Sequence, residues 1–269
     1  MGEIGLPFKD IREYNSQMSK ALEDKLFFIS ELPIDKYVFV DFGCADGSLI
    51  NELRRVYGLD SVYIGYDSST AMIDIAKRNC VVSDGIYFTD DWGKVRKLLP
   101  VVLKTDCVPV LILSSVIHEV YSYGGEKDIE EFWQKVLYSG FEYIIVRDMM
   151  WAKDMDRHTN IGMLNKVLAR PEYQTYVQDF INRWGTLENN KNMVHFLLKY
   201  RYRINWTREV NENYFPISIE DFLDKFKSGS SYRLDYFEKF RVKYIEEAIY
   251  NDFGVILRDT THIKAIFRI

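Results

Sequence analysis

The sequence has few cysteines and no long uninterrupted hydrophobic stretch. Its three cysteines, Cys44, Cys80 and Cys107, are odd in number and widely spaced, which argues against a disulfide framework and against a zinc site built from cysteine pairs. No apolar run approaches the roughly 18 to 20 residues that a membrane-spanning helix needs. We therefore expect reduced thiols, no metal ion and no membrane segment.

Positive charge is not in excess either. The formal net charge is −5, so no global basic field would attract nucleic acid, and any such contact would need a local basic patch. The first residues place no basic segment before an apolar one, as a secretory signal does, and we therefore expect a cytoplasmic protein. Apolar residues, in contrast, make up 47% of the 269 residues, enough for one large α/β domain with a substantial core.

The most informative stretch is residues 37–47, an apolar run that breaks into a turn containing glycines. Residues 38–40 have the pattern of a buried strand, and residues 48–53 resume with helical spacing. Gly43 and Gly47 have no Cβ, so the backbone can bend sharply and approach a ligand at which the following helix points free N–H groups. The pattern predicts a nucleotide-binding turn, with an ordinary strand-to-helix turn as the alternative.

The spacing of the glycines indicates which nucleotide. A dinucleotide fingerprint requires Gly-x-Gly-x-x-Gly, so that the pyrophosphate can lie at the helix N-terminus. Here three residues separate Gly43 from Gly47, and Asp41 and Asp46 would repel a pyrophosphate. An acid at the end of the strand suits a cationic ligand better.

This turn resembles the first motif of the class I S-adenosylmethionine-dependent methyltransferases, which reads roughly (Asp/Glu)-x-Gly-x-Gly-x-Gly. Asp41, Gly43, Ala45 and Gly47 match it, with Ala45 in place of the middle glycine. The resemblance implies S-adenosyl-L-methionine as the cofactor, bound by these four residues and by Cys44 in the same turn. It also implies a Rossmann-like α/β fold, a seven-stranded and mostly parallel sheet with helices on both faces.

A second acid follows at the end of the next predicted strand, residues 61–67. Asp67 lies about 20 residues after the turn, where a carboxylate can accept both ribose hydroxyls of a nucleoside. Ser68 beside it is a further candidate for cofactor binding. The alternative is that Asp67, Ser68 or Ser69 caps the predicted helix over residues 70–79. Both roles are compatible.

The third predicted strand runs into an acidic, aromatic corner. The resemblance implies an acid here that binds the adenine amino group and an apolar neighbour that packs on the ring, roles that Asp91 and Trp92 match. Asp90 is the rival acid. The alternative is an N-cap for the predicted helix over residues 93–99.

The fourth predicted strand, residues 108–115, is a continuous apolar run, as in a central parallel strand buried on both faces. Ligands of parallel sheets gather at the carboxyl ends of the strands, so we expect Ser114 and Ser115 to contact the cofactor. His118 and Glu119 would lie beside the reacting methyl group, where a histidine of near-neutral pKa suits proton removal. The alternative is that this segment only shapes the pocket.

Asp148 is a further candidate acid or base, because it ends the fifth predicted strand, residues 141–148. The resemblance divides the chain into a methyltransferase core over residues 37–151 and 216–269 and a helical insertion over residues 152–215, which would act as a substrate lid. The apolar spacing before residue 33 predicts an N-terminal helical cap over residues 1–36.

Within the insertion, residues 199–208 alternate cations with aromatic residues. Cations can hold phosphates while aromatic faces stack on bases, so a nucleotide or RNA acceptor is one hypothesis. It would be contacted by Lys199, Arg201, Arg203 and Arg208. The alternative is a solvated edge with arginines that extend their charged ends into water.

Taken together, these features predict a methyltransferase that transfers a methyl group to an oxygen or nitrogen of a small molecule or of a nucleotide or RNA. Two other functions are compatible with the same turn. One is a catalytically inactive S-adenosylmethionine-binding subunit that acts as a scaffold or activator. The other is a dinucleotide-dependent oxidoreductase, which the missing Gly-x-Gly-x-x-Gly disfavours.

Overall fold

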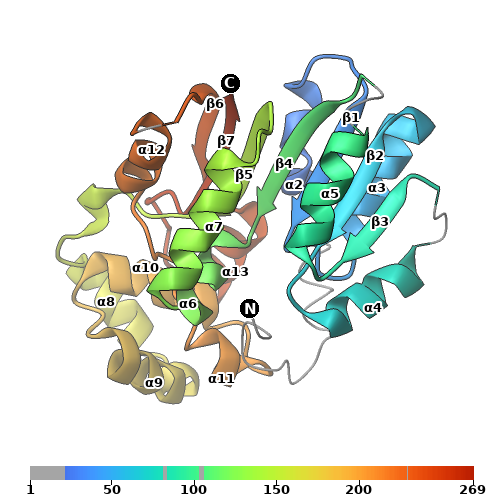
Figure 1. The fold of residues 1–269 in the computed structure, drawn as a ribbon. Helices are drawn as coiled ribbons and strands as arrows, with labels where there is room; N and C mark the ends of the chain where they lie inside the picture. The colour runs from blue at the N-terminus through green and yellow to red at the C-terminus, as the bar shows by residue number, and fades with distance from the viewer. Residues whose placement is uncertain (1–21, 81–83, 103–105, 229) are drawn as a thin grey trace.

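A seven-stranded sheet runs through the molecule in the computed structural model, which describes residues 22–80, 84–102, 106–228 and 230–269 (Figure 1). The strand order is β3-β2-β1-β4-β5-β7-β6. The strands are β1 (Tyr37–Phe42), β2 (Val62–Tyr66), β3 (Ile86–Thr89), β4 (Val108–Ser114), β5 (Tyr143–Met149), β6 (Arg233–Phe240) and β7 (His262–Arg268). The first five are parallel, and β7 is antiparallel to both β5 and β6. This confirms the predicted Rossmann-like, mostly parallel sheet.

Strand β1 lies inside the sheet between β2 and β4, and all six of its residues are buried. Val40 pairs with Ile64 of β2 on one side and with Leu111 of β4 on the other. From β1 the chain builds outward through β2 and β3 and then returns to the other side of β1 as β4. The order therefore reverses between β1 and β4, and ligands of open α/β sheets bind at the carboxyl ends of the strands beside such a reversal.

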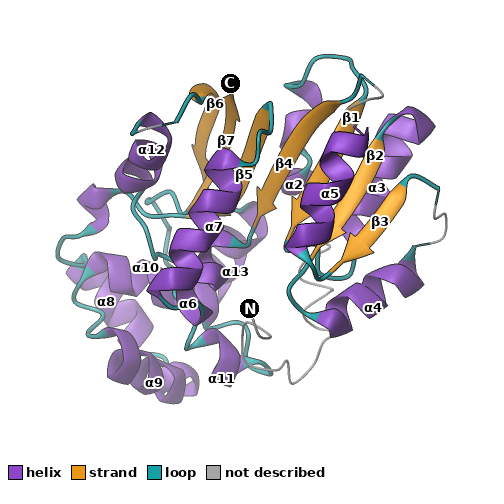
Figure 2. Ribbon diagram, in the orientation of Figure 1, coloured by secondary structure: helices purple, strands orange, loops and turns teal. Residues whose placement is uncertain are grey.

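Helices cover both faces of the sheet (Figure 2). One face packs on α5 (Trp92–Val102), α7 (Glu126–Tyr138) and α12 (Ile219–Lys227), and the other packs on η1 (Phe27–Ser30) and α3 (Ser48–Tyr57). The other helices described outside residues 152–215 are α2 (Leu22–Lys25), η2 (Gly58–Asp60), α4 (Thr70–Asn79), α6 (Ile117–Tyr123) and α13 (Lys243–Phe253). Alternating residues of β1 serve the two faces, since Val40 belongs to one cluster and Phe39 to the other.

Residues 152–215 are helical, as predicted. They form η4 (Lys153–Met155), α8 (Ile161–Leu168), η5 (Pro171–Tyr173), α9 (Gln174–Trp184), α10 (Asn190–Lys199) and α11 (Trp206–Glu209). These helices share a hydrophobic cluster with α13, in which Phe180 and Phe196 join Ile249 and Phe253. Helix α13 thereby ties the segment to the closing strands of the sheet.

Of the predicted N-terminal cap, residues 1–21 lie outside the described residues, and residues 22–36 contain α2 and η1. Phe28 of η1 is buried against the sheet in the cluster that also holds Phe39. No helix among the described residues is long and apolar enough to cross a membrane.

Candidate active site

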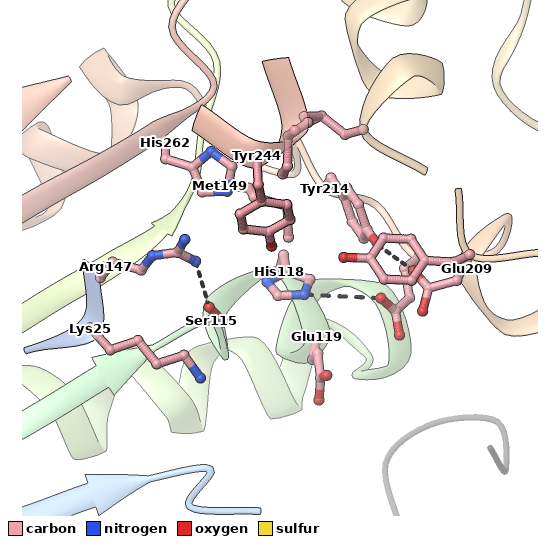
Figure 3. Close-up of a pocket in the computed structure, with 14 residues that line it drawn as sticks. Lys25, Ser115, His118, Glu119, Arg147, Met149, Glu209, Tyr214, Tyr244 and His262 are labelled. Atoms are coloured by element: carbon pink, nitrogen blue, oxygen red, sulfur yellow. Dashed lines mark hydrogen bonds and ion pairs between the residues drawn. The ribbon is translucent and has the colours of Figure 1, made fainter. Parts of the chain in front are cut away.

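A cavity of about 90 Å³ lies at the carboxyl ends of β4 and β5. Its walls come from α2, from the segment after β4, from β5 and β7, from the predicted insertion and from α13 (Figure 3). The lining residues are Lys25, Ser115, His118, Glu119, Arg147, Met149, Leu198, Tyr202, Glu209, Glu212, Tyr214, Tyr244, Ile245 and His262. The cavity therefore gathers residues from both ends of the chain beside the strand reversal.

A buried histidine and aspartate pair forms one wall. His118 lies in the first turn of α6, and its Nδ1 is 2.8 Å from Oδ1 of Asp148 at the end of β5. Asp148 is 0% exposed, and it also accepts hydrogen bonds from the backbone N–H groups of Ile117 (2.7 Å) and Met149 (2.8 Å). A carboxylate beside Nδ1 favours a proton on that nitrogen, which leaves Nε2 to accept one. Two residues predicted to be catalytic are therefore in direct hydrogen-bond contact.

The charges around His118 decide its pKa. Burial by itself would lower the pKa, but the charge and hydrogen bond of Asp148 together with the charges of Glu212 and Glu119 outweigh burial, and the pKa is raised above its ordinary value. Nε2 of His118 lies 4.0 Å from Oε2 of Glu212. Burial and repulsion by Glu212 raise the pKa of Glu119 to about 7, although Arg208 opposes this.

This arrangement predicts a pH-dependent contribution to stability. Because the folded-state pKa of His118 is raised, the pair with Asp148 contributes fully below the unfolded pKa of about 6.5 and loses its contribution as pH rises through the folded pKa. We expect the difference in unfolding free energy between the parent and His118→Gln to shrink as pH rises, measured by urea unfolding between about pH 5 and 9. A difference that is constant or grows with pH would contradict the assigned direction.

The segment after α10 closes the cavity through buried polar contacts. Lys199 donates to the backbone carbonyls of Glu209 and Glu212, and its Nζ lies 3.9 Å from the centre of the Tyr214 ring. Burial lowers the pKa of Lys199 to about 7. The Tyr214 hydroxyl donates to the carboxylate of Glu209. Arg208 is buried as well, 2.8 Å from Oε1 of Glu212.

These positions bear on the hypothesis of a nucleic-acid acceptor. Of the four cations predicted to contact it, Lys199 and Arg208 are interior and bind the protein itself. Arg201 is half-buried against the rings of Tyr202 and Tyr244, and Arg203 is exposed. Residues 199–208 therefore do not form the continuous basic surface that a polyphosphate backbone would need.

The glycine turn after β1 is held by its own packing. The N–H groups of Gly43 and Cys44 both donate to the carbonyl of Tyr66, at 2.7 and 3.0 Å. Gly43 has φ +81° and Gly47 has φ +77°, conformations that favour glycine. A Cβ added to Gly43 would lie 2.7 Å from Cγ2 of Val116, so this glycine is required by the close approach of α6 as well as by its φ. Cys44 is buried, and burial raises the pKa of its thiol well above the ordinary value.

Two carboxylates flank this turn. Asp67 accepts hydrogen bonds from the N–H groups of Ala45 (3.0 Å, Oδ2) and Ser69 (2.9 Å, Oδ1), while Ser68 beside it is half-buried. Each oxygen of a carboxylate has two lone pairs, so each can accept one further hydrogen bond. Asp41 is 3% exposed, and burial raises its pKa to about 7 although the charge of Lys25 opposes this.

The corner after β3 has the geometry of a helix start. Oδ1 of Asp91 accepts the N–H of Gly93 at 2.8 Å, the bond that an N-cap residue makes with the second residue of a helix. Oδ2 of Asp90 accepts the hydroxyl of Thr70 at 2.7 Å. Trp92 is 8% exposed and packs on Phe42 and Tyr66, with ring centres 5.2 Å apart in both pairs. Trp92 thus contributes to the hydrophobic core, and the adenine contacts of Asp91 and Trp92 both stay predictions.

At the end of β4, the two predicted serines differ. Ser114 is buried, and its hydroxyl has no hydrogen-bond partner among the described residues. Ser115 adopts φ +58° and accepts a hydrogen bond of 2.9 Å from Arg147. Ser115 lines the cavity, whereas Ser114 lies in the strand.

Several cavity residues were not predicted. Arg147 directly precedes Asp148 at the end of β5. The sequence offered one indication of its position, because neighbouring side chains of a strand point to opposite faces of the sheet. Glu209 and Glu212 follow the cationic run of residues 199–208 and form no pattern of their own. Lys25 carried no local signal. In the described parts of the chain, no group of three or more His, Cys, Asp and Glu residues is placed to hold a metal ion.

Comparison with known proteins gives matches at the level of structure. No protein-family model and no curated protein sequence matches the chain. A chain from the complex between the Haloferax volcanii Trm112 methyltransferase activator and a methyltransferase is 11% identical, with a TM-score of 0.50 and coverage of 96% of this chain and 94% of that one. An S-adenosylmethionine-dependent methyltransferase from Mesorhizobium loti is 14% identical, with a TM-score of 0.49 and coverage of 90% and 96%. The likeness to the first of these shows a shared fold.

Proposed function

We propose that this chain, which has the fold of the class I S-adenosylmethionine-dependent methyltransferases, transfers a methyl group to an oxygen or nitrogen of a small molecule. The observation that carries the proposal is the buried pair of His118 and Asp148, which faces a cavity at the carboxyl ends of β4 and β5. On the other side of the strand reversal lies the turn from Asp41 to Gly47.

The residues around that turn fit the cofactor. Asp67 has lone pairs left for two ribose hydroxyls, and Asp41 is a buried acid whose charge a cationic ligand would stabilise. We assign these two residues and the backbone from Gly43 to Gly47 to cofactor binding. When bound, S-adenosylmethionine would supply a methyl group already activated by its sulfonium charge.

The chain itself must then orient the acceptor and remove its proton. We assign Nε2 of His118 as the atom that receives the proton of the acceptor. Asp148 would hold the imidazole in position through Nδ1 and stabilise the imidazolium that results, and its negative charge strengthens His118 as a base. Glu212, 4.0 Å from Nε2, would add to that stabilisation.

A small acceptor suits this site better than a nucleic acid does. The cavity is about 90 Å³, and two of the cations proposed for a phosphate backbone are interior. We propose that residues 152–215 act as the lid over the acceptor, because Leu198, Tyr202, Glu209, Glu212 and Tyr214 from this segment line the cavity.

Cofactor binding is tested at Asp67. We expect Asp67→Ala to weaken the binding of S-adenosylhomocysteine by about 1.5–3 kcal/mol, the range for hydrogen bonds to a charged group, which is roughly 10- to 150-fold in Kd. Titration calorimetry measures it, with Asp67→Asn as the variant that keeps the side-chain size and one acceptor oxygen. The exposed Asp74 on α4 supplies the control, Asp74→Asn, for which affinity should not change. Unchanged affinity in Asp67→Ala would remove Asp67 from the site.

Methyl transfer is tested with S-adenosylmethionine carrying a tritiated methyl group. The protein is incubated with the small-molecule fraction and, separately, with the RNA fraction of a cell extract, and Asp67→Ala serves as the control that should fail to transfer. We expect label in the small-molecule fraction. Binding of S-adenosylhomocysteine without transfer to any fraction would favour the inactive scaffold or activator, and binding of NAD alone would favour an oxidoreductase.

A further inference from the structure

One side of the cavity is cationic. Arg147 is 5% exposed, and the NH1 group donates to the Ser115 hydroxyl at 2.9 Å. Among the described residues, no carboxylate lies within 4.0 Å of its guanidinium, and its Nε has no hydrogen-bond partner. Burial lowers the pKa of Arg147, although Asp24 and Asp148 attract it from a distance. A buried charge without a carboxylate partner is costly, and an arginine does not escape the cost by losing its proton.

A second cation faces the same space. Lys25 of α2 is 6% exposed and lines the cavity with Arg147. Burial, followed by repulsion from Arg147, lowers the pKa of Lys25 to about 8, while Asp41, Asp46 and Glu119 oppose the shift. An anion between the two side chains would offset the repulsion and stabilise both charged forms.

The surroundings hold the guanidinium in one orientation. Arg147 pairs with Ser114 on β4 and with Lys264 on β7, and its Cζ lies 5.7 Å from the centre of the Phe240 ring. Figure 3 shows Arg147 and Lys25 on one side of the cavity and His118 across from them. A fixed guanidinium fork matches the two oxygens of a carboxylate, to which it can donate two parallel hydrogen bonds.

The other walls are apolar or aromatic, formed by Met149, Leu198, Tyr202, Tyr244 and Ile245. They suit the hydrocarbon or ring part of a small molecule. With the function proposed above as its basis, we infer that the methyl acceptor is a small organic acid. Its carboxylate binds Arg147 and Lys25, and the oxygen or nitrogen that receives the methyl group lies at His118.

The test separates the extract before the reaction. Small molecules are divided by anion exchange at neutral pH, and the retained part is divided again into a sample treated with phosphatase and an untreated sample. Each is incubated with the protein and tritiated S-adenosylmethionine. We expect label with the retained molecules, undiminished by phosphatase. If only the unretained molecules are labelled, or if phosphatase removes the label, the inference that the acceptor is a carboxylic acid is wrong. The proposal of methyl transfer is unaffected by either result. No label in any fraction overturns the proposed function as well.

Variants of Arg147 test whether this residue binds the carboxylate of the methyl acceptor. We expect Arg147→Gln to raise the KM for the retained fraction at least tenfold with kcat less affected, and Arg147→Lys to lose less because it keeps the charge. The control Arg96→Gln, at an exposed arginine of α5 outside the cavity lining, should match the parent. Urea unfolding confirms that each variant is folded. A KM for Arg147→Gln equal to that of the parent overturns the inference.

A competing assignment gives the same two cations to the carboxylate of the cofactor. Binding of S-adenosylhomocysteine and of 5′-methylthioadenosine, which lacks the carboxylate, distinguishes the two. We expect Arg147→Gln to bind both as the parent does. If it loses affinity for S-adenosylhomocysteine and keeps it for 5′-methylthioadenosine, the carboxylate belongs to the cofactor and the inference is wrong.

Discussion

Replacing His118 by glutamine is expected to lower methyl transfer by about 10²–10⁴-fold, the range that a positioned general acid or base contributes. The reason is that His118 lines the cavity while its Nδ1 is held 2.8 Å from Asp148, and no other described histidine of the lining is paired with a carboxylate. The measurement is the rate of label transfer to the extract fraction that accepts it. Affinity for S-adenosylhomocysteine should not change, because His118 lies on the acceptor side.

The pH profile distinguishes a base from a residue that only shapes the pocket. A general base must be deprotonated, so transfer by the parent should rise with pH through the raised pKa of His118. Asp148→Asn removes the charge that raises this pKa, and the rise should therefore move to lower pH. In His118→Gln the rise should disappear. If His118→Gln retains transfer within about threefold of the parent, the alternative of a shaping role is correct.

The elements that could be predicted are those with local causes. Helix α7 is recognisable in the sequence because its apolar residues recur with helical spacing and Gly124 and Gly125 precede it. β1 and β4 were recognisable because strands buried on both faces read as continuous apolar runs. Helix α13 was missed, although Ile245, Ile249 and Phe253 repeat at four-residue intervals.

The site was harder to predict because its contacts join distant segments. Glu212 lies 4.0 Å from His118 although 94 residues separate them in the sequence (212 − 118). Lys199 and Arg208 looked like surface cations, and only the tertiary structure places acceptors around them in the interior. Trp92 was predicted from an aromatic residue after an acid, and only the tertiary structure shows that it packs on Phe42 and Tyr66, while its contact with adenine stays a prediction.

The turn after β1 depends on a local backbone conformation and on a contact with a distant segment. Substitution of Gly43 in this turn is expected to have a large effect on stability and on cofactor binding. Gly43→Val places a β-branched side chain at φ +81°, a conformation that costs about 1–3 kcal/mol for a residue other than glycine. Its Cβ would also lie 2.7 Å from Cγ2 of Val116, and overpacking of this kind costs about a further 1–3 kcal/mol. We expect a loss of about 2–6 kcal/mol in unfolding free energy, measured in urea, and no detectable binding of S-adenosylhomocysteine.

The two costs can be separated with Gly43→Ala, Val116→Ala and the double variant. In the Val116→Ala background the steric part of the Gly43→Ala cost should disappear and the backbone part should remain, so the two substitutions should couple. Equal costs in both backgrounds would mean that Val116 yields to the new side chain, and backbone conformation alone would then account for the glycine. The cofactor assignment has its own decisive result, because a folded Gly43→Val protein that binds S-adenosylhomocysteine as tightly as the parent would place the cofactor away from this turn.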